Sequence, residues 1–471
     1  MINFRQYNNV TKIVIPDGVT LTNSNFDNKF SNMASLTEVK IPYKKLISMP
    51  YVCFNCRNLT GSPVCGDKVT SLHNAYYRCY NLTGSPVCGP NVTSMDSAYG
   101  TSAITGSPVC GNKVISMAYA YQHCYGLTGS PVCGDMVTNM TGTYSYCNNL
   151  TGSPVCGNNV TSMHYTYINC TNLTGSPVCG PNVTGMYCTY NSCINLTGSP
   201  VCGNNVTGMQ YTYSECYNLT GSPVCGPNVT NMYLTYYNCY NLNGSPVCGN
   251  QVKNMDRAYY GCRNLTGSPV CGQNVTNMQA TYYNCTNLTG SPVCGPNVTS
   301  MGGTYQKCYN LTGSPVCGNN VYYMNYAYYS CQNLTGSPVC ENNVAQMRQT
   351  YYNCHNLTGS PVCGEKVTSM YGTYQKCPNL RGNSYFYSPN VANAQSCFYG
   401  RNTANILRIY TVKNSTTMST LLVNNASSLV GATITWTDDT ATNGCYYNTQ
   451  YNIYIYPVDD VAAARTANGD D

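Results

Sequence analysis

Apolar residues recur along this chain with a period of 23 residues. Within one period, Leu265 to Asn287, a Leu is followed by Pro-Val-Cys and then by Val, Met, Tyr and Cys at fixed places. The segment Gly-Ser-Pro-Val-Cys occurs fourteen times, and twelve of the thirteen intervals between its prolines are 23 residues long. Repetition at a short fixed period is typical of a solenoid, whose coils bury their apolar faces against one another. The pattern therefore predicts a stack of coils.

Two segments of each coil have patterns of their own. Ser-Pro-Val-Cys is short and has a β-branched centre, which predicts a brief strand in a parallel stack. Its proline has no N–H to donate, so we expect it at the first residue of that strand. After each Met, a small residue, a Tyr and a Cys follow at positions three, four and seven. This spacing predicts one helical turn with a single buried face.

The pattern changes at both ends, which predicts three parts. Residues 1–35 are expected to form a divergent capping coil, in which Val10–Val19 alternates like an edge strand. Residues 36–401 are expected to form the solenoid of 23-residue coils, and residues 402–471 a small β-rich cap or attachment domain. One coil is irregular: Ser102 takes the place of the Cys and one residue is missing before Ile104. A small kink is expected there, with no function assigned.

The C-terminal part alternates apolar and polar residues in three stretches. We expect strands at 406–412, 432–436 and 451–456, closing the open end of the stack, with Trp436 as an anchor. A short helix is expected after Val461, followed by a loose end that offers a contact for another protein.

The repeat columns resemble those of the BspA-type leucine-rich repeat family. The residues that match its pattern are Leu36, Val39, Ile41 and Pro42, then Ile13, Ile15, Pro16 and Val19, and in a later coil Val64, Val69, Leu72, Ala75, Tyr76 and Cys79. The resemblance covers about residues 10 to 400 and implies an α/β-type leucine-rich-repeat-like solenoid. Two departures are Pro-Val-Cys in place of Ile-x-Ile-Pro and an extra residue in the turn before Val.

The family also implies a setting. Its members are typically surface-exposed binding or adhesion proteins of bacteria and some protists, and similar arrays occur in phage genomes. The even repeats, the small β cap and the absence of an apolar leader after Met1 look more like the phage case. We therefore expect a virion protein, such as a fibre or a capsid or tail decoration, with a bacterial or protist surface adhesin as the alternative.

The amino-acid composition limits the kinds of partner that the chain is expected to bind. Only 8% of residues are charged, against about 25% in ordinary domains, while 42% are hydrophobic and regularly placed. This argues against disorder. The net charge of +6 is spread without a basic run, so nucleic acid is not an expected partner. No run approaches the roughly 20 apolar residues of a membrane span. The chain is expected in the cytosol or in a particle that leaves the cell by lysis.

Most of the 32 cysteines fall into two columns. One column follows Pro-Val and the other lies three residues after Tyr; Cys53, Cys188, Cys397 and Cys445 fall outside both. The structural ladders are expected to include Cys65, Cys88 and Cys110, Cys79 and Cys124, and Tyr76, Tyr99 and Tyr121. A rise of roughly 4.8 Å per coil is compatible with disulfide Cα distances of about 4.4–6.8 Å, so pairing stays open. Reduced ladders of small buried side chains are the favoured interpretation.

No catalytic constellation is visible. The four His are scattered, the carboxylates are not paired, and Cys53-Phe-Asn-Cys56 is an isolated C-x-x-C. The Asn-x-Thr sequons are read as repeat turns. We therefore expect no enzyme, no cofactor and no metal.

The two positions after Met and the two after Tyr vary from coil to coil, and Tyr, Asn, Ser and Gln dominate there. Such residues make adaptable contacts in paratopes. The candidate ligand surface comprises Tyr165, Tyr187, Gln210, Tyr211, Tyr233, Arg257, Tyr326, Arg348 and Tyr371.

Three hypotheses follow from these positions. The array is a structural spacer or decoration, it binds a cell-surface glycan or protein, or it is a cytosolic scaffold for protein partners. A terminal domain would contact other virion proteins, and a fibre would be a homotrimer, although no heptad pattern indicates a coiled coil.

Overall fold

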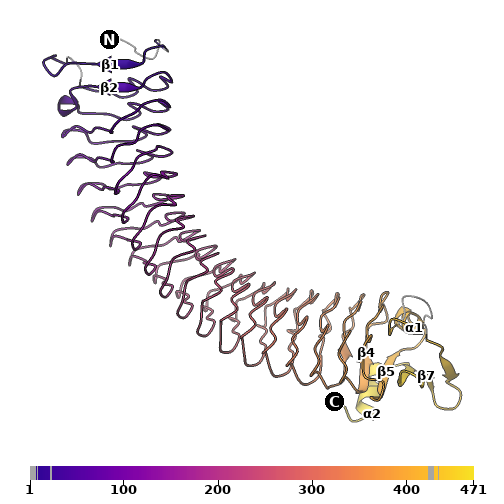
Figure 1. The fold of residues 1–471 in the computed structure, drawn as a ribbon. Helices are drawn as coiled ribbons and strands as arrows, with labels where there is room; N and C mark the ends of the chain where they lie inside the picture. Colours follow the sequence, from indigo (N-terminus) through magenta and orange to yellow (C-terminus); the bar gives the residue numbers. More distant parts are fainter. Residues whose placement is uncertain (1–6, 8, 22–23, 423–428, 433, 471) are drawn as a thin grey trace. The chain divides into compact units, whose positions relative to one another are not determined.

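The computed structural model describes residues 7, 9–21, 24–422, 429–432 and 434–470 (Figure 1). The chain divides into two compact units, Met1–Val229 with Asn238–Leu242, and Thr230–Tyr237 with Asn243–Asp471. Each unit is a stack of coils that follow the sequence period, and the predicted repeat solenoid is therefore confirmed.

The first unit begins with a short parallel pair of strands. Strand β1 (Lys12–Val14) pairs with β2 (Glu38–Lys40), and Ile13 lies opposite Val39. A single 3-10 turn, η2 (Tyr43–Lys45), follows β2. The strand predicted within Val10–Val19 is confirmed, and a neighbouring coil covers one of its edges.

The predicted strand at Ser-Pro-Val-Cys is wrong for most coils. Among the described residues, this segment forms a regular strand only at β3 (Val362–Cys363). Elsewhere the coils pair through single parallel bridges at the residue before Met, for example Ser71 with Ser94 and Asn254 with Asn277. The proline cannot donate to a ladder, and the N–H of the following Val is used inside its own coil.

The segment after Met forms consecutive β-turns, and the predicted helical turn is not formed. Ala75 donates its N–H to the carbonyl oxygen of Leu72 in the same coil, at 2.9 Å, whereas Asn74 donates to Asp96 of the next coil, also at 2.9 Å. Asn74 and Arg78 have φ values of 53° and 62°. Alternate N–H groups thus hold the neighbouring coil, which an α-helix could not allow because it uses its N–H groups internally.

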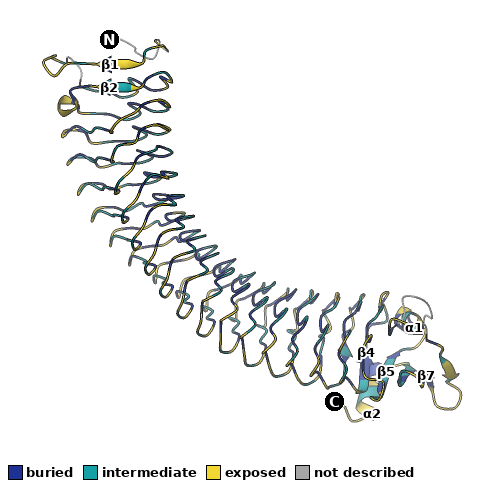
Figure 2. Ribbon diagram, in the orientation of Figure 1, coloured by how far each residue is buried: buried dark blue, intermediate teal, exposed yellow. Residues whose placement is uncertain are grey.

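The apolar columns form the core, as the sequence predicts (Figure 2). In one coil of the first unit, Leu150, Val160, Met163, Tyr167 and Cys170 are all 0% exposed. The proline of Pro-Val-Cys is also buried, whereas the Val and Cys after it are mostly half-buried. The stack is therefore held by one layer of buried side chains in each coil.

A tyrosine hydroxyl spans the inside of each regular coil. In the second unit, Tyr282 donates its hydroxyl to the carbonyl oxygen of Val270 at 2.7 Å and accepts the N–H of the same Val270 at 3.0 Å. Both backbone groups of the Val are thereby satisfied without a strand. This explains why the column holds Tyr where the related pattern has Phe.

The tyrosine rings also stack between coils. The ring centroids of Tyr76 and Tyr99 are 5.8 Å apart and those of Tyr99 and Tyr121 are 5.6 Å apart, with interplanar angles of 4° and 7°. Offset stacks of this spacing are favourable. The predicted tyrosine ladder is confirmed.

The two cysteine columns differ in environment. The inner thiols are fully buried, and that of Cys147, for example, donates to the carbonyl oxygen of Tyr121 at 2.9 Å. The outer thiols, such as Cys110, are half-buried, and burial raises the pKa of Cys110 to about 12. Cys53 occupies the place of the core Tyr in its coil, and its carbonyl oxygen accepts a hydrogen bond from the thiol of Cys79 at 3.1 Å. The C-x-x-C at 53–56 is thus two neighbouring columns of the repeat.

The Asn side chains before Leu contact the backbone of the preceding coil. Asn149 donates its side-chain amide to the carbonyl oxygen of Tyr125 in the preceding coil at 2.8 Å, and Asn195 donates to Thr171 at 3.0 Å. These amides satisfy carbonyl groups at a bend where no strand ladder exists.

The second unit ends in a six-stranded sheet that continues the Pro-Val-Cys column. Its strand order is β3-β4-β5-β8-β7-β6; the first four are parallel and the last two antiparallel. The elements after β3 are β4 (Gly382–Phe386), β5 (Leu407–Val412), α1 (Thr416–Leu422), β6 (Thr437–Asp439), β7 (Cys445–Asn448), β8 (Ile453–Val458) and α2 (Val461–Ala467).

Three of the C-terminal elements agree with the predictions from the sequence. Strands β5 and β8 and helix α2 lie where the alternation predicts them. The strand expected at 432–436 is wrong in its described residues, since β6 begins only at Thr437. Trp436 is half-buried, and its indole N–H has no hydrogen-bond partner in the described structure.

Removing one core hydroxyl should destabilise the stack. The substitution Tyr282→Phe leaves the N–H and carbonyl of Val270 without their partner, at a cost of about 1–3 kcal/mol in the free energy of unfolding measured in urea. Tyr374→Phe is the matched control, because the buried Tyr374 hydroxyl has no partner and Val362 donates instead to Pro338. Equal losses in the two variants would contradict this assignment.

The cysteines should titrate as thiols. Under denaturing, non-reducing conditions, a disulfide-exchange reagent is expected to detect 32 thiols per chain. In the native protein at pH 8, the raised pKa of Cys110 lowers its thiolate fraction by roughly a thousandfold relative to a free cysteine, so alkylation followed by mass spectrometry should be correspondingly slow. A thiol count near zero would show paired columns.

Candidate binding surface

The variable positions lie on the turns that follow Met. The second position after Met has a positive φ in residues as different as Tyr165 (56°), Leu234 (54°) and Arg257 (52°). Non-glycine residues in this region cost of order 1 kcal/mol or more and persist only where the surroundings impose them. Here the bonds between coils impose the backbone, so the side chain can vary.

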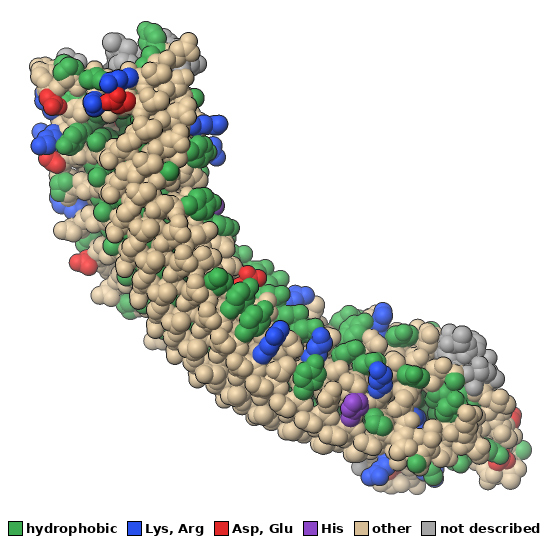
Figure 3. All heavy atoms as spheres, viewed as in Figure 1, with side chains coloured by type: hydrophobic (Ala, Val, Ile, Leu, Met, Phe, Trp, Pro, Cys, Tyr) green, Lys and Arg blue, Asp and Glu red, His purple; other side chains and the backbone are tan. Residues whose placement is uncertain are grey.

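The surface between these positions carries little charge. Figure 3 shows a face made largely of uncharged polar side chains and backbone, with isolated Lys and Arg side chains. Recognition on such a surface depends on the places where aromatic and charged side chains gather.

In the first unit, three predicted tyrosines lie next to one another. The ring centroids of Tyr165 and Tyr187 are 5.2 Å apart and those of Tyr187 and Tyr211 are 5.9 Å apart, both edge to face. A hollow of about 530 Å³ adjoins them and is lined by Tyr165, Tyr187 and Gln210 among others. The structure thus brings together four of the predicted residues.

Two glycines open this hollow. Gly185 and Gly208 occupy the place before Met where most other coils have Ser or Asn. A Cβ atom on Gly185 would lie 2.3 Å from the imidazole of His164. The Nδ1 atom of His164 accepts the N–H of Tyr187 at 3.2 Å, and burial lowers the pKa of His164. His164 is therefore part of the wall of the hollow.

In the second unit, Arg348 lies between two predicted tyrosines. Its guanidinium carbon is 5.9 Å from the ring centroid of Tyr326 and 5.2 Å from that of Tyr371. The backbone N–H of Arg348 is held by Asn325 Oδ1 at 2.7 Å. These contacts orient a cation between two aromatic faces.

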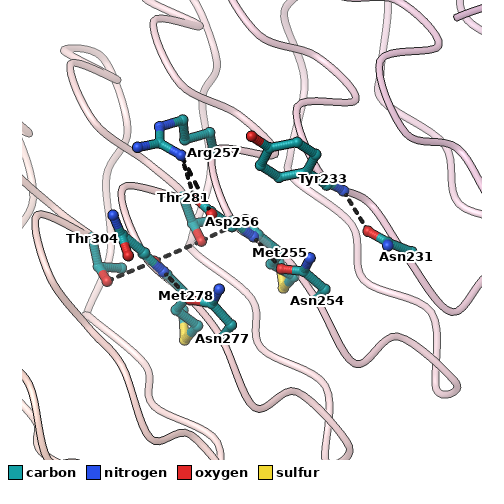
Figure 4. A network of polar contacts seen from close by, with 11 residues as sticks. Asn231, Tyr233, Asn254, Met255, Asp256, Arg257, Asn277, Met278, Thr281 and Thr304 are labelled. Carbon is teal, nitrogen blue, oxygen red and sulfur yellow. Dashed lines mark hydrogen bonds and ion pairs between the residues drawn. The ribbon is translucent and has the colours of Figure 1, made fainter.

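Two other predicted residues have local polar partners, shown in Figure 4. Arg257 forms an ion pair with Asp256 at 3.2 Å, and burial raises the pKa of that carboxyl. The backbone N–H of Tyr233 donates to Asn231 Oδ1 at 2.9 Å. The charge of Arg257 is thus largely compensated, unlike that of Arg348.

A second aromatic column was not singled out from the sequence. It consists of the residue after the core Tyr, and its rings stack at 4.3 Å between Tyr260 and Tyr283 and at 4.5 Å between Tyr329 and Tyr352. The pKa of Tyr260 is raised to about 12 by burial and by the neighbouring Tyr283. The doublet Tyr-Tyr, repeated at 236, 259, 282, 328 and 351, was the available signal.

Lys376 covers one ring of this column, and a contact between Tyr326 and Tyr329 connects the column to Arg348. Lys376 lies 5.4 Å from the ring centroid of Tyr352, and the ring centroids of Tyr326 and Tyr329 are 6.2 Å apart. A hydrogen bond to Tyr352 raises the pKa of Lys376. We name the aromatic–cation surface as the set Tyr326, Tyr329, Arg348, Tyr352, Tyr371 and Lys376.

A polar hollow follows the Asn and Thr columns in the same unit. It has a volume of about 780 Å³, and Lys253, Tyr322 and Lys366 lie on its wall. Lys366 donates to Asn343 Oδ1 at 2.7 Å. The hollow lacks the stacked rings that orient the cation of Arg348.

Metal and membrane chemistry have no evident site in the described ranges. Within residues 7, 9–21, 24–422, 429–432 and 434–470, no three or more His, Cys, Asp or Glu side chains gather as metal ligands would. The same residues contain no helix that is long and apolar enough to cross a bilayer.

The coils and their aromatic surfaces define a repeat solenoid, and two solved structures that match along most of the chain are leucine-rich repeat proteins. One is a leucine-rich repeat protein from Bacteroides ovatus, with 14% identity, a TM-score of 0.40, and coverage of 91% of this chain and 92% of the other. Another is a leucine rich cell surface protein from Faecalibacterium prausnitzii, with 14% identity, a TM-score of 0.30, and coverage of 89% and 91%. No protein-family model matches the sequence, and no curated protein does either.

Filling the glycine gap should move His164. The substitution Gly185→Ser places a side chain where the imidazole lies, so the ring is displaced toward solvent and its lowered pKa should rise toward the ordinary value. An NMR titration of the four His, with His164→Gln for assignment, measures this shift. Gly208→Ser is the control, because its Cβ meets the flexible end of Gln210. An unchanged pKa in Gly185→Ser would refute the proposed wall.

Proposed function

We propose that this chain is a non-enzymatic recognition protein whose aromatic–cation surface binds an acidic cell-surface glycan. The observation that carries the proposal is Arg348, held between Tyr326 and Tyr371 and continuous with the stacked Tyr329 and Tyr352. A cation and several ring faces in fixed positions suit a ligand with both apolar faces and negative groups.

The chemistry of the surface favours a saccharide over a protein patch. Ring faces stack on the C–H faces of sugars, and Arg binds carboxylate or sulfate groups through paired N–H donors. The rings are already stacked at 4.5 Å, so little side-chain entropy is lost when a ligand binds.

The second part of the proposal concerns where the protein is located. We assign the chain to a virion, as a fibre or decoration, with residues 402–471 as the part that attaches to other particle proteins. Its nearly identical coils give a periodic surface for multivalent contact with a host. Mass spectrometry of purified particles tests this assignment, and recovery of the chain only from a bacterial or protist cell surface, or with a cytosolic partner, would replace it.

Removing two cations from the surface should weaken binding to an acidic polysaccharide. The double substitution Arg348→Gln and Lys376→Gln is expected to lower the affinity for immobilised heparin or hyaluronan by tenfold or more, measured by biolayer interferometry, and raising the salt should weaken the parent protein further. Dextran serves as the uncharged reference polymer.

A matched control separates site chemistry from net charge. The double substitution Lys44→Gln and Lys68→Gln removes the same charge from exposed positions of the first unit and should leave the affinity within twofold. Equal losses in the two double variants, or equal binding to dextran, would refute the proposed site. Unfolding curves of each variant establish that the fold is intact.

A further inference from the structure

The irregular coil carries a pocket on its surface. In the first unit, a cavity of about 440 Å³ is lined by Tyr80, Thr101, Ser102, Ala103, His123, Tyr125 and Gly126. These residues come from three coils, and the middle one is the coil that lacks a residue before Ile104. A volume of this size falls in the range of about 300–1,000 Å³ that small-molecule sites have.

Two exposed tyrosines line this pocket, one from the coil before the irregular coil and one from the coil after it. Tyr80 and Tyr125 both follow the core Cys, and they are 46% and 53% exposed. Adjacent tyrosines in this column, Tyr217 and Tyr240, have ring centroids 5.0 Å apart. In the coil between Tyr80 and Tyr125, the same position is Ala103. Two steps of the 5.0 Å spacing between Tyr217 and Tyr240 correspond to a separation of roughly 10 Å between the two rings. One ring-shaped ligand placed midway would stack on both walls at an ordinary distance.

The coils at this pocket lack two of the asparagines that precede Leu in other coils. In other coils the Asn before Leu donates its amide to a carbonyl of the preceding coil, as Asn149 does to Tyr125. The irregular coil has lost this Asn, and the next coil has Gly126 in its place. A Cβ atom on Gly126 would lie 2.7 Å from the carbonyl oxygen of Ile104. A side chain at this place would therefore clash with the backbone, and Gly126 forms part of the wall of the cavity.

The pocket wall is uncharged and has polar groups around its rings. None of its lining residues is Asp, Glu, Lys or Arg, and burial lowers the pKa of His123, which favours the neutral imidazole. His123 Nδ1 and the hydroxyl of Tyr125 are 2.9 Å apart and form a hydrogen bond, and Thr101 adds a hydroxyl. The Thr101 hydroxyl donates to the carbonyl oxygen of Gly100 at 2.7 Å, and its oxygen can still accept a hydrogen bond from a polar ligand.

From this geometry we propose that the pocket binds one neutral pyranose ring, sandwiched between Tyr80 and Tyr125 with its hydroxyl groups directed to His123 and Thr101. This inference goes beyond the proposed function, because it concerns other residues and an uncharged sugar. A pyranose has two C–H faces for the tyrosine walls and a polar rim for the remaining groups.

The test uses the full chain and a panel of methyl glycosides of neutral hexoses and N-acetylhexosamines, observed by saturation-transfer NMR and titration. At least one glycoside should bind. Ala103→Tyr supplies the ring that the column lacks and should abolish binding while the unfolding curve is unchanged. Tyr125→Ala removes one wall and should weaken binding tenfold or more.

Controls distinguish this site from a general effect. Tyr309→Ala changes an exposed tyrosine of the same column outside the pocket, and Tyr352→Ala changes the aromatic–cation surface; both should bind the glycoside as the parent does. Binding to none of the glycosides, undiminished binding by Ala103→Tyr, or preferential binding of 3-methylindole would overturn the proposal. If the parent protein binds a glycoside but does not bind heparin, only the function proposed for the second unit is refuted.

Discussion

The structure depends on one interaction, in which a buried tyrosine hydroxyl satisfies both backbone groups of the Val in Pro-Val-Cys. A proline precedes this Val, so the segment cannot build a regular ladder. In the coil of Tyr282 the hydroxyl supplies donor and acceptor together, at 2.7 and 3.0 Å. Where a regular strand does form, at β3 (Val362–Cys363), the facing Tyr374 hydroxyl loses its partner. Strand pairing and the tyrosine contact are therefore alternative solutions to the same requirement.

A second constraint follows at the turns after Met. Each turn shares its N–H groups between its own coil and the next, which holds two residues per coil at positive φ. The backbone is thus set by neighbouring coils, and the side chains there are free to differ. This explains how one coil can present Tyr165 and another Arg257 at the same place. The positions that set the fold are therefore separate from the positions proposed for recognition.

The sequence was sufficient for the stack and its core, because the Leu, Val, Met, Tyr and Cys columns follow directly from the period. The sequence did not predict the backbone conformation where hydrogen bonds between coils determine it. Residues spaced at three, four and seven after Met mimic a helix, but Asn74 bonds the next coil and lies at positive φ. Of the candidate surface residues, Tyr326, Arg348 and Tyr371 lie together, whereas Arg257 pairs with Asp256. Tyr329 and Tyr352 were missed because their contacts depend on stacking between coils.

Amide hydrogen exchange of the Val residues in Pro-Val-Cys tests the central claim most directly. With selective 15N-valine labelling, the N–H of Val270 should exchange as slowly as an amide in a regular strand, although no backbone group accepts it. Val178, Val201 and Val293 bond their own tyrosines in the same way and should behave alike. Exchange of these amides at the rate of an unprotected peptide, in the folded protein, would contradict the account.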